Sequence, residues 1–130
     1  MNALEIQTAV YARLSAQLDT PVYDDVPQGS EYPYTVIGDD TAVEWDGDTF
    51  LGTEATLTIH TWSQYSGRAE VKGIMSSIYA ALHRYSLSIA GYNTVTCTWE
   101  FAETFLEADG ETRHGVQRFR LITHAIDSTV

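Results

Sequence analysis

The chain has 130 residues, of which 44% are hydrophobic, and a formal net charge of −11 at pH 7. This length suits one domain spanning residues 1–130, and the apolar and aromatic content predicts a folded core rather than disorder. So acidic a surface repels phosphate, which disfavours a protein that grips nucleic acid. No stretch approaches the roughly 20 apolar residues of a membrane helix, and the N-terminus lacks the pattern of a signal peptide. We therefore expect synthesis and use in a cytoplasm, with no membrane as partner.

Cys97 is the only cysteine, which excludes an intramolecular disulfide and a cysteine-rich zinc site. It alternates with Val95, Trp99 and Phe101, a pattern that predicts a small buried hydrophobic side chain on a strand. A nucleophilic role is the less favoured alternative.

Residues 3–18 have the spacing of an amphipathic helix, with an apolar stripe made of Leu4, Val10, Tyr11, Leu14 and Leu18. Asn2 is the predicted N-cap, and Pro21 lies just past the end. Three prolines then favour an extended segment up to residue 33, with a short strand at 22–24 and a turn at 28–30.

Residues 34–46 and 50–63 predict a long β-hairpin that turns at Asp46-Gly47-Asp48. In its second strand, the alternation predicts an inward-facing set consisting of Ala55, Leu57, Ile59 and Thr61.

A second helix is predicted at 68–85, with an apolar face made of Val71, Met75, Ile78, Leu82 and Tyr85. Within it, Gly73 suggests a close approach of helix and sheet, and His83 and Arg84 suit the macrodipole near its C-terminal end. Residues 94–108 and 113–126 predict a second hairpin. The resulting fold class is α+β: two helices packed on a mainly antiparallel sheet of four to five strands, in the order αβββαββ.

The sequence contains no positive catalytic signal. It has no GxSxG, GxxxxGK[ST], GxGxxG or HExxH motif, and Asp39, Asp40, Asp46, Asp48 and Glu54 do not match an EF-hand loop. We therefore expect neither enzymatic activity nor a cofactor or metal. His60 and His124 project from the polar faces of different strands and are possible neighbours. The two histidines leave a metal site as a weaker alternative. Together with Glu100 they leave the pocket of a small-molecule-binding or hydrolytic domain as another.

The basic residues form two clusters, Arg68 with Lys72 and Arg113 with Arg118 and Arg120. Arg118 and Arg120 are predicted to share one strand face. In so acidic a chain they suit pairing with carboxylates, either of the same subunit at little gain in stability or of a neighbouring one.

The segments VYDDVPQGSEYPYTVIGDDT, LTIHTWSQYSGRAEVKGIMSSIYAALH and FAETFLEADGETRHGVQRFRL occur in this order. Over residues 3–125 the chain resembles the tail-terminator, or tail-completion, proteins of long-tailed phages and gene transfer agents. The resemblance implies a non-enzymatic virion protein that forms a ring, typically hexameric, at the head-proximal end of the tail tube. There it would end tube polymerisation, contact the head-completion or stopper protein, and surround a channel through which DNA passes without specific binding.

Long strands with free edges are compatible with lateral packing in a closed ring. The acidic run 39–54 is a candidate for the channel lining or for a rim that faces a partner. The predicted contacts to an adjacent ring lie at the first hairpin's tip: Glu44, Trp45, Asp46, Asp48 and Phe50. Burial of Trp45 against its own sheet is an equal alternative. The sequence does not separate phage from gene transfer agent, and a neck or stopper protein or a tube subunit is the second functional reading.

Overall fold

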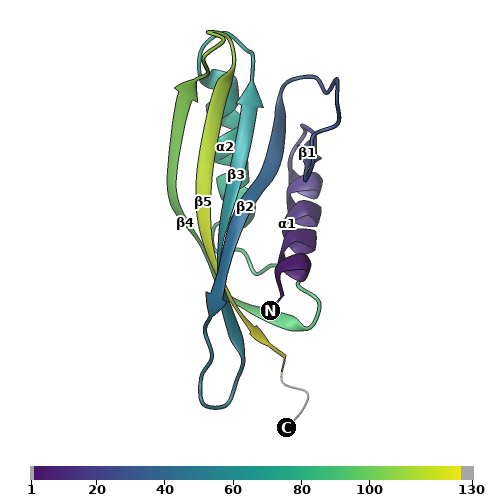
Figure 1. The fold of residues 1–130 in the computed structure, drawn as a ribbon, viewed down its shortest axis with the longest axis vertical. Coiled ribbons are helices and arrows are strands. Elements are labelled where there is room, and N and C mark those ends of the chain that lie inside the picture. The colour runs from purple at the N-terminus through teal and green to yellow at the C-terminus, as the bar shows by residue number, and fades with distance from the viewer. Residues whose placement is uncertain (1, 127–130) are drawn as a thin grey trace.

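The computed structural model describes residues 2–126, in which two helices cover one face of a five-stranded sheet (Figure 1). The predicted order αβββαββ is confirmed. The elements are α1 (Ala3–Gln17), β1 (Val22–Tyr23), β2 (Tyr34–Glu44), β3 (Gly52–Ser63), α2 (Ala69–Leu82), β4 (Tyr92–Leu106) and β5 (Arg113–Ala125). Neither helix in residues 2–126 is long and apolar enough to cross a membrane.

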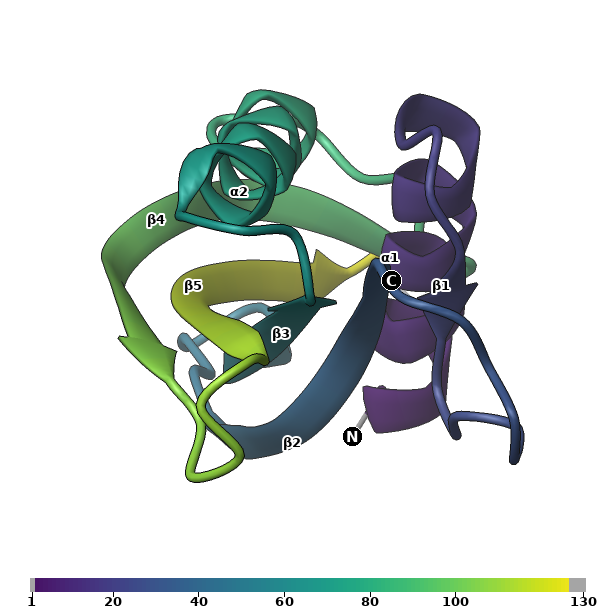
Figure 2. The same cartoon turned by 90° about the horizontal axis from the view of Figure 1, so that it is seen from above.

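The strands lie in the order β1-β2-β3-β5-β4. The short β1 runs parallel to β2, and all other neighbours are antiparallel. The sheet is strongly twisted (Figure 2). The turn of the β2–β3 hairpin and the turn of the β4–β5 hairpin lie at opposite ends of the long axis (Figure 1).

The core lies between the sheet and the two helices. Along β3 every second side chain is buried, as predicted: Thr53, Ala55, Leu57, Ile59, Thr61 and Ser63. They pair across the sheet with the buried side of β5, which contributes Phe119 and Leu121. Cys97 is 1% exposed and belongs to the same cluster. Burial raises the pKa of Cys97 to about 12, so at neutral pH its thiol is protonated and a poor nucleophile.

The predicted apolar face of α1 is confirmed in part: Val10 and Leu14 are buried and Leu18 packs against the core, but Leu4 and Tyr11 face solvent. Ile6 and Ala9 are buried as well, whereas Leu4 is 73% exposed. The helix carries two apolar stripes, and the sheet covers the one with spacings of four residues from Ile6 to Leu14.

The predicted N-cap position of Asn2 is confirmed, and its carbonyl oxygen accepts the backbone N–H of Ile6 at 3.0 Å. Asn2 makes no side-chain cap; its buried Nδ2 instead donates a hydrogen bond of 2.9 Å to Oγ1 of Thr123 in β5. A partner 121 residues away in the sequence therefore takes the place of the local backbone.

The apolar face of α2 is as predicted as far as Leu82, the last residue of the helix. Tyr85 lies beyond it, with the guanidinium carbon of Arg13 3.6 Å from its ring centre. His83 and Arg84 therefore lie outside the helix. The Nδ1 atom of His83 accepts a hydrogen bond of 3.0 Å from the backbone N–H of Trp99.

The predicted close approach at Gly73 is wrong. A Cβ atom at Gly73 would have no neighbour within 4 Å, whereas a Cβ atom at Gly115 in β5 would lie 2.5 Å from Sδ of Met75. The glycine that lets α2 approach the sheet is therefore in the strand and not in the helix.

Candidate functional site

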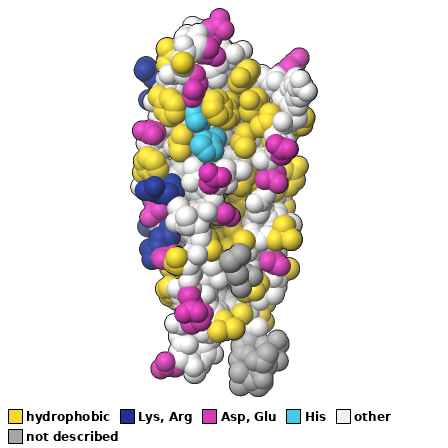
Figure 3. Space-filling model, in the orientation of Figure 1, with side chains coloured by type: hydrophobic (Ala, Val, Ile, Leu, Met, Phe, Trp, Pro, Cys, Tyr) yellow, Lys and Arg dark blue, Asp and Glu magenta, His cyan; other side chains and the backbone are white. Residues whose placement is uncertain are grey.

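The side of the sheet that the helices leave uncovered is called the open face here (Figure 3). The outward residues of β3 and β5 contribute Glu54, Thr56, Thr58, His60, Trp62, His114, Val116, Arg118 and Arg120. Hydrophobic side chains flank its histidines, and the Lys and Arg side chains visible in this view lie along the side of β4 and β5 (Figure 3). The open face is thus partly aromatic and partly charged.

Arg118 and Arg120 lie on this one face of β5, as expected. Nε of Arg118 lies 3.2 Å from Oε1 of Glu100 on β4, and Arg120 is paired with Oε2 of Glu54 on β3. Both arginine side chains remain 46% exposed. Such solvated pairs contribute at most about 1 kcal/mol each, so both guanidinium groups can exchange these partners for others at small cost.

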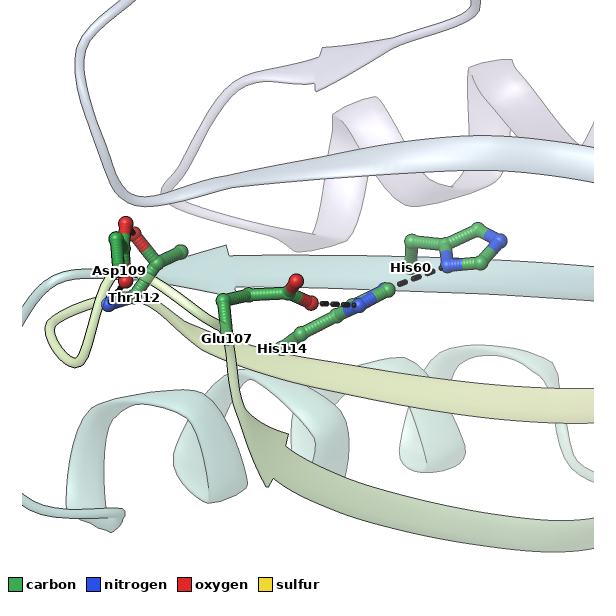
Figure 4. Close-up of polar contacts among 5 residues, drawn as sticks. All are labelled: His60, Glu107, Asp109, Thr112 and His114. Carbon is green, nitrogen blue, oxygen red and sulfur yellow. Dashed lines mark hydrogen bonds and ion pairs between the residues drawn. The ribbon is translucent and has the colours of Figure 1, made fainter.

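A chain of hydrogen bonds joins Glu107, His114 and His60 on the open face (Figure 4). Nδ1 of His114 lies 2.8 Å from Oε1 of Glu107, and Nε2 of His114 lies 2.7 Å from Nδ1 of His60. A carboxylate only accepts, so Nδ1 of neutral His114 carries the proton and its Nε2 accepts the N–H of His60. This arrangement leaves Nε2 of His60 as a free acceptor.

Aromatic rings hold His114 in this position. Its ring centre lies 3.7 Å from that of Trp62 in a stacked geometry and 4.7 Å from that of Phe105. His114 is 8% exposed. The imidazoles are therefore built into a packed cluster, and sequence reasoning missed it because only the register of β3 with β5 places Trp62 opposite His114.

The expectation that His60 and His124 are neighbours is wrong. His60 pairs with Val116, whereas His124 pairs with Gly52, eight positions away along β3. At about 3.4 Å per residue this separation is roughly 27 Å. The carboxylate of Glu100 accepts a hydrogen bond from Arg118, so His60, His124 and Glu100 form no common pocket. Within residues 2–126 no group of three or more His, Cys, Asp or Glu side chains is placed to hold a metal ion.

We predict that acid destabilises the fold through His60. Burial, and then the nearby His114, lowers the pKa of His60 from its ordinary value, and Asp39 opposes this shift. Below about pH 6.5 the unfolded chain binds this proton more readily than the folded one. The contribution of His60 to the free energy of unfolding is thus complete above pH 6.5 and is lost as the pH falls towards the folded pKa.

Urea unfolding at pH 7.5, 6.5 and 5.5 measures this effect. His60→Gln is expected to flatten the dependence, whereas His124→Gln, the same change at the far end of β3, leaves it as in the unmodified chain. If the free energy of unfolding falls with pH equally in His60→Gln and in the unmodified protein, His60 is not the source of the destabilisation by acid.

The tip of the β2–β3 hairpin is held by its own side chains. The rings of Trp45 and Phe50 lie 5.4 Å apart, and that of Phe50 lies 6.0 Å from His124. Oδ1 of Asp46 accepts the backbone N–H of Gly52 at 2.8 Å. Trp45 is half-buried against this hairpin, while Leu51 beside it is 67% exposed. The tip is therefore an ordered projection with an apolar side chain left uncovered.

Carboxylates crowd the same tip. A hydrogen bond with Asp46, and then the charge of Asp46, raises the pKa of Glu44 above its ordinary value. Asp48, two residues after Asp46, is exposed in the turn.

The residues predicted as interface thus fall into three places. Glu44, Trp45, Asp46, Asp48 and Phe50 lie at the β2–β3 end of the molecule. Arg68 precedes α2, Lys72 lies in its first turn, and Arg113 opens β5 opposite Ser63, all three at the other end. Arg118 and Arg120 lie between the ends on the open face. They do not form a single site.

The family model described as Tail completion protein gp17 matches residues 8–124 of the chain. Tail completion protein gp17 of Bacillus phage SPP1 is 32% identical over 89 residues, which cover 68% of this chain and 66% of that protein, a little under two thirds of its length.

Two solved structures share the fold. A chain from the virion of a native gene transfer agent particle superposes with a TM-score of 0.84 at 23% identity, over 95% of this chain and 98% of that one. The structure of bacteriophage SPP1 gp17 superposes with a TM-score of 0.61 at 24% identity, over 98% of this chain and 92% of that one.

Proposed function

Because this chain belongs to the tail completion protein gp17 family, we propose that it is a tail terminator, which ends polymerisation of the tail tube and joins the tail to the head. The resemblance found in the sequence is therefore confirmed. Tail completion is a structural role, so the protein is a virion structural component and not an enzyme.

In this proposal, copies of residues 1–130 act as single domains in a ring, with six copies as the expected number. The ring sits at the head-proximal end of the tail, on the last ring of the tube protein, and its other side receives the head-completion or stopper protein. Assembly takes place in the cytoplasm of the bacterial host. The match of the family model over nearly the whole chain is the observation that carries this proposal.

Two features of the subunit support a ring that contacts another ring. Its two sheet edges differ, since β1 covers a small part of β2 and β4 has no neighbour on its outer side in residues 2–126. Two different edges suit a head-to-tail contact that closes by rotation. The projecting β2–β3 tip, with Leu51 exposed, suits a contact to an adjacent ring.

The acidic run 39–54 suits a channel lining or a rim. Asp39, Asp40, Glu44, Asp46 and Asp48 are all exposed. Carboxylates repel phosphate, so DNA would pass a wall of this kind without binding to it. The channel lining or rim would consist of those carboxylates of this run that no neighbouring copy in the ring covers.

Removal of the gene tests the function. We expect tails of abnormal length, or tails and filled heads that do not join, in the phage or gene transfer agent that encodes the chain. Particles of normal tail length with joined heads would overturn the proposal. Imaging of intact particles places the subunit: density at the last ring of the tube supports the terminator, whereas density in the neck or along the tube identifies a stopper or a tube subunit instead.

A further inference from the structure

We propose that the groove between α2 and β4 of one subunit receives the free edge of β2, residues 38–44, of a second copy. This inference rests on the ring proposed above and names the two surfaces that meet in it. It is carried by an unfilled groove, by two buried polar groups without partners, and by the way the chain's charge is divided.

The groove has a volume of about 600 Å³. Lys72 and Tyr79 of α2 line one side of the groove, and Trp99 and Glu103 of β4 line the other. Gln117 of β5 also lines it and pairs with Ala102, which lies between Trp99 and Glu103 on β4. Tyr79 is 40% exposed although its ring meets that of Trp99 edge-on at 5.7 Å. The groove is thus an aromatic-lined surface with the positive charge of Lys72 at its rim.

Two polar atoms of this groove lack a hydrogen bond. Nε2 of Gln117 donates to the carbonyl oxygen of Met75 at 3.0 Å, which fixes the orientation of the amide. Oε1 of Gln117 and the indole Nε1–H of Trp99 are buried and have no partner in the described part of the chain. Gln117 is 2% exposed. An unmade hydrogen bond at a buried group is costly, and a covering segment with one donor and one acceptor would remove this cost if the side chains over the two atoms shift on binding.

The charge of the chain selects the covering segment. Residues 19–54 carry ten acidic and no basic side chains, so they hold −10 of the net −11. Residues 55–126 carry six of each sign and are neutral. A contact between two acidic segments would oppose like charges, whereas a contact of the acidic β2 edge with the neutral part of the chain that bears Lys72 avoids this repulsion. The basic side chains seen in Figure 3 lie on the side of β4 and β5, away from β2.

The free part of β2 has the required chemistry. β1 pairs with Thr35 and Val36 only, and residues 39–44 are all exposed. Asp39 and Asp40 supply carboxylates for Lys72, and the hydroxyl and peptide groups of Thr41 supply a donor and acceptors. β2 and β4 run in opposite directions. Copies related by rotation about an axis parallel to the strands therefore bring these two edges together antiparallel.

A photo-crosslinking amino acid placed at position 79 tests the contact in purified particles. We expect the crosslinked peptide to contain residues 38–44 of another copy. The same probe at Tyr65, which is exposed outside the groove, is expected to give no such product. Crosslinks from position 79 to another segment of the chain, or to a different protein, would overturn this inference and leave the ring intact. If no crosslink or density shows a neighbouring copy in the particle, both the groove contact and the ring are overturned.

Charge reversal gives a second test that does not depend on the probe. Lys72→Glu is expected to reduce incorporation into particles by at least about tenfold, because it adds a like charge against β2. Arg84→Glu makes the same change in net charge outside the groove and is expected to incorporate normally. Circular dichroism of each variant is the check that it folds. Equal incorporation of the two variants would count against the groove as the site of contact.

A mixture of two blocked variants establishes the polarity of the contact. Ser76→Trp fills the groove, and Ala42→Trp blocks the β2 edge. In a head-to-tail arrangement neither variant assembles alone. When the two are mixed on isolated tail tubes, the intact groove of Ala42→Trp receives the intact β2 edge of Ser76→Trp, so pairs form but no ring closes. Closed rings from either variant alone would contradict the proposal.

Discussion

Phe119→Ala is expected to lower the free energy of unfolding by about 3–5 kcal/mol, the largest effect of any substitution considered for this chain. Phe119 is 0% exposed and is the largest of the fully buried side chains. It lies in β5, paired with Leu57 of β3 on one side and Trp99 of β4 on the other. Truncation removes its buried surface and leaves a cavity that three strands surround and that cannot collapse easily. Urea unfolding followed by circular dichroism measures the change.

Phe105→Ala is the matched control, because it deletes the same atoms from the open face, where Phe105 is 40% exposed. Its cost is expected to be clearly lower than that of Phe119→Ala, since 40% of the surface of Phe105 is already in contact with water. Equal costs at the two positions would show that the core does not centre on Phe119.

Gly115→Ala is expected to lower the free energy of unfolding by about 1–3 kcal/mol through overpacking. The new Cβ atom would lie 2.5 Å from Sδ of Met75 and 3.1 Å from Cγ2 of Val71, both on the buried face of α2. The Met75 side chain can move aside, but Val71 is rigid about χ1, so α2 must shift away from the sheet. The double variant Gly115→Ala with Val71→Ala is expected to show a coupling in denaturation measurements.

Gly73→Ala supplies the opposite case within the same helix–sheet pair. A Cβ atom there meets nothing within 4 Å, and the residue lies inside α2. The substitution is expected to stabilise the fold by about 0.5–1 kcal/mol, because alanine has the higher helix propensity. If Gly73→Ala destabilises the fold, the close approach of α2 to the sheet is at Gly73 and not only at Gly115.

The number, type and order of the elements could be predicted from local pattern. The strict alternation from Gly52 to Ser63 identifies a strand with one covered face, and the spacing from Val71 to Leu82 identifies a helix. Both repeats are local properties of the chain. Each repeat identifies the type of element and shows where its apolar residues lie. They cannot tell which of two apolar stripes a neighbour will cover, which is why Leu4 and Tyr11 were placed on the wrong side of α1.

The candidate sites depended on register, which the sequence does not contain. The expectation that His60 and His124 are neighbours rests on the fact that both lie on polar faces of strands. Only the alignment of β3 with β5 places His60 beside His114, opposes Trp62 to His114 and separates His124 by eight positions. A shift of one residue would exchange the two faces of β5, and that choice is made by the packing of Phe119 and Leu121 between helices and sheet.

The sequence by itself determined the fold class, the family and the division of charge, because these follow from residue spacing, motif order and composition along the chain. The tertiary structure alone decided which glycine admits α2, which histidines touch, and that Trp99 and Gln117 share a groove with polar atoms left unpaired. These are contacts between residues up to 54 positions apart. Such contacts are set by how strands align and helices dock, which no local pattern specifies.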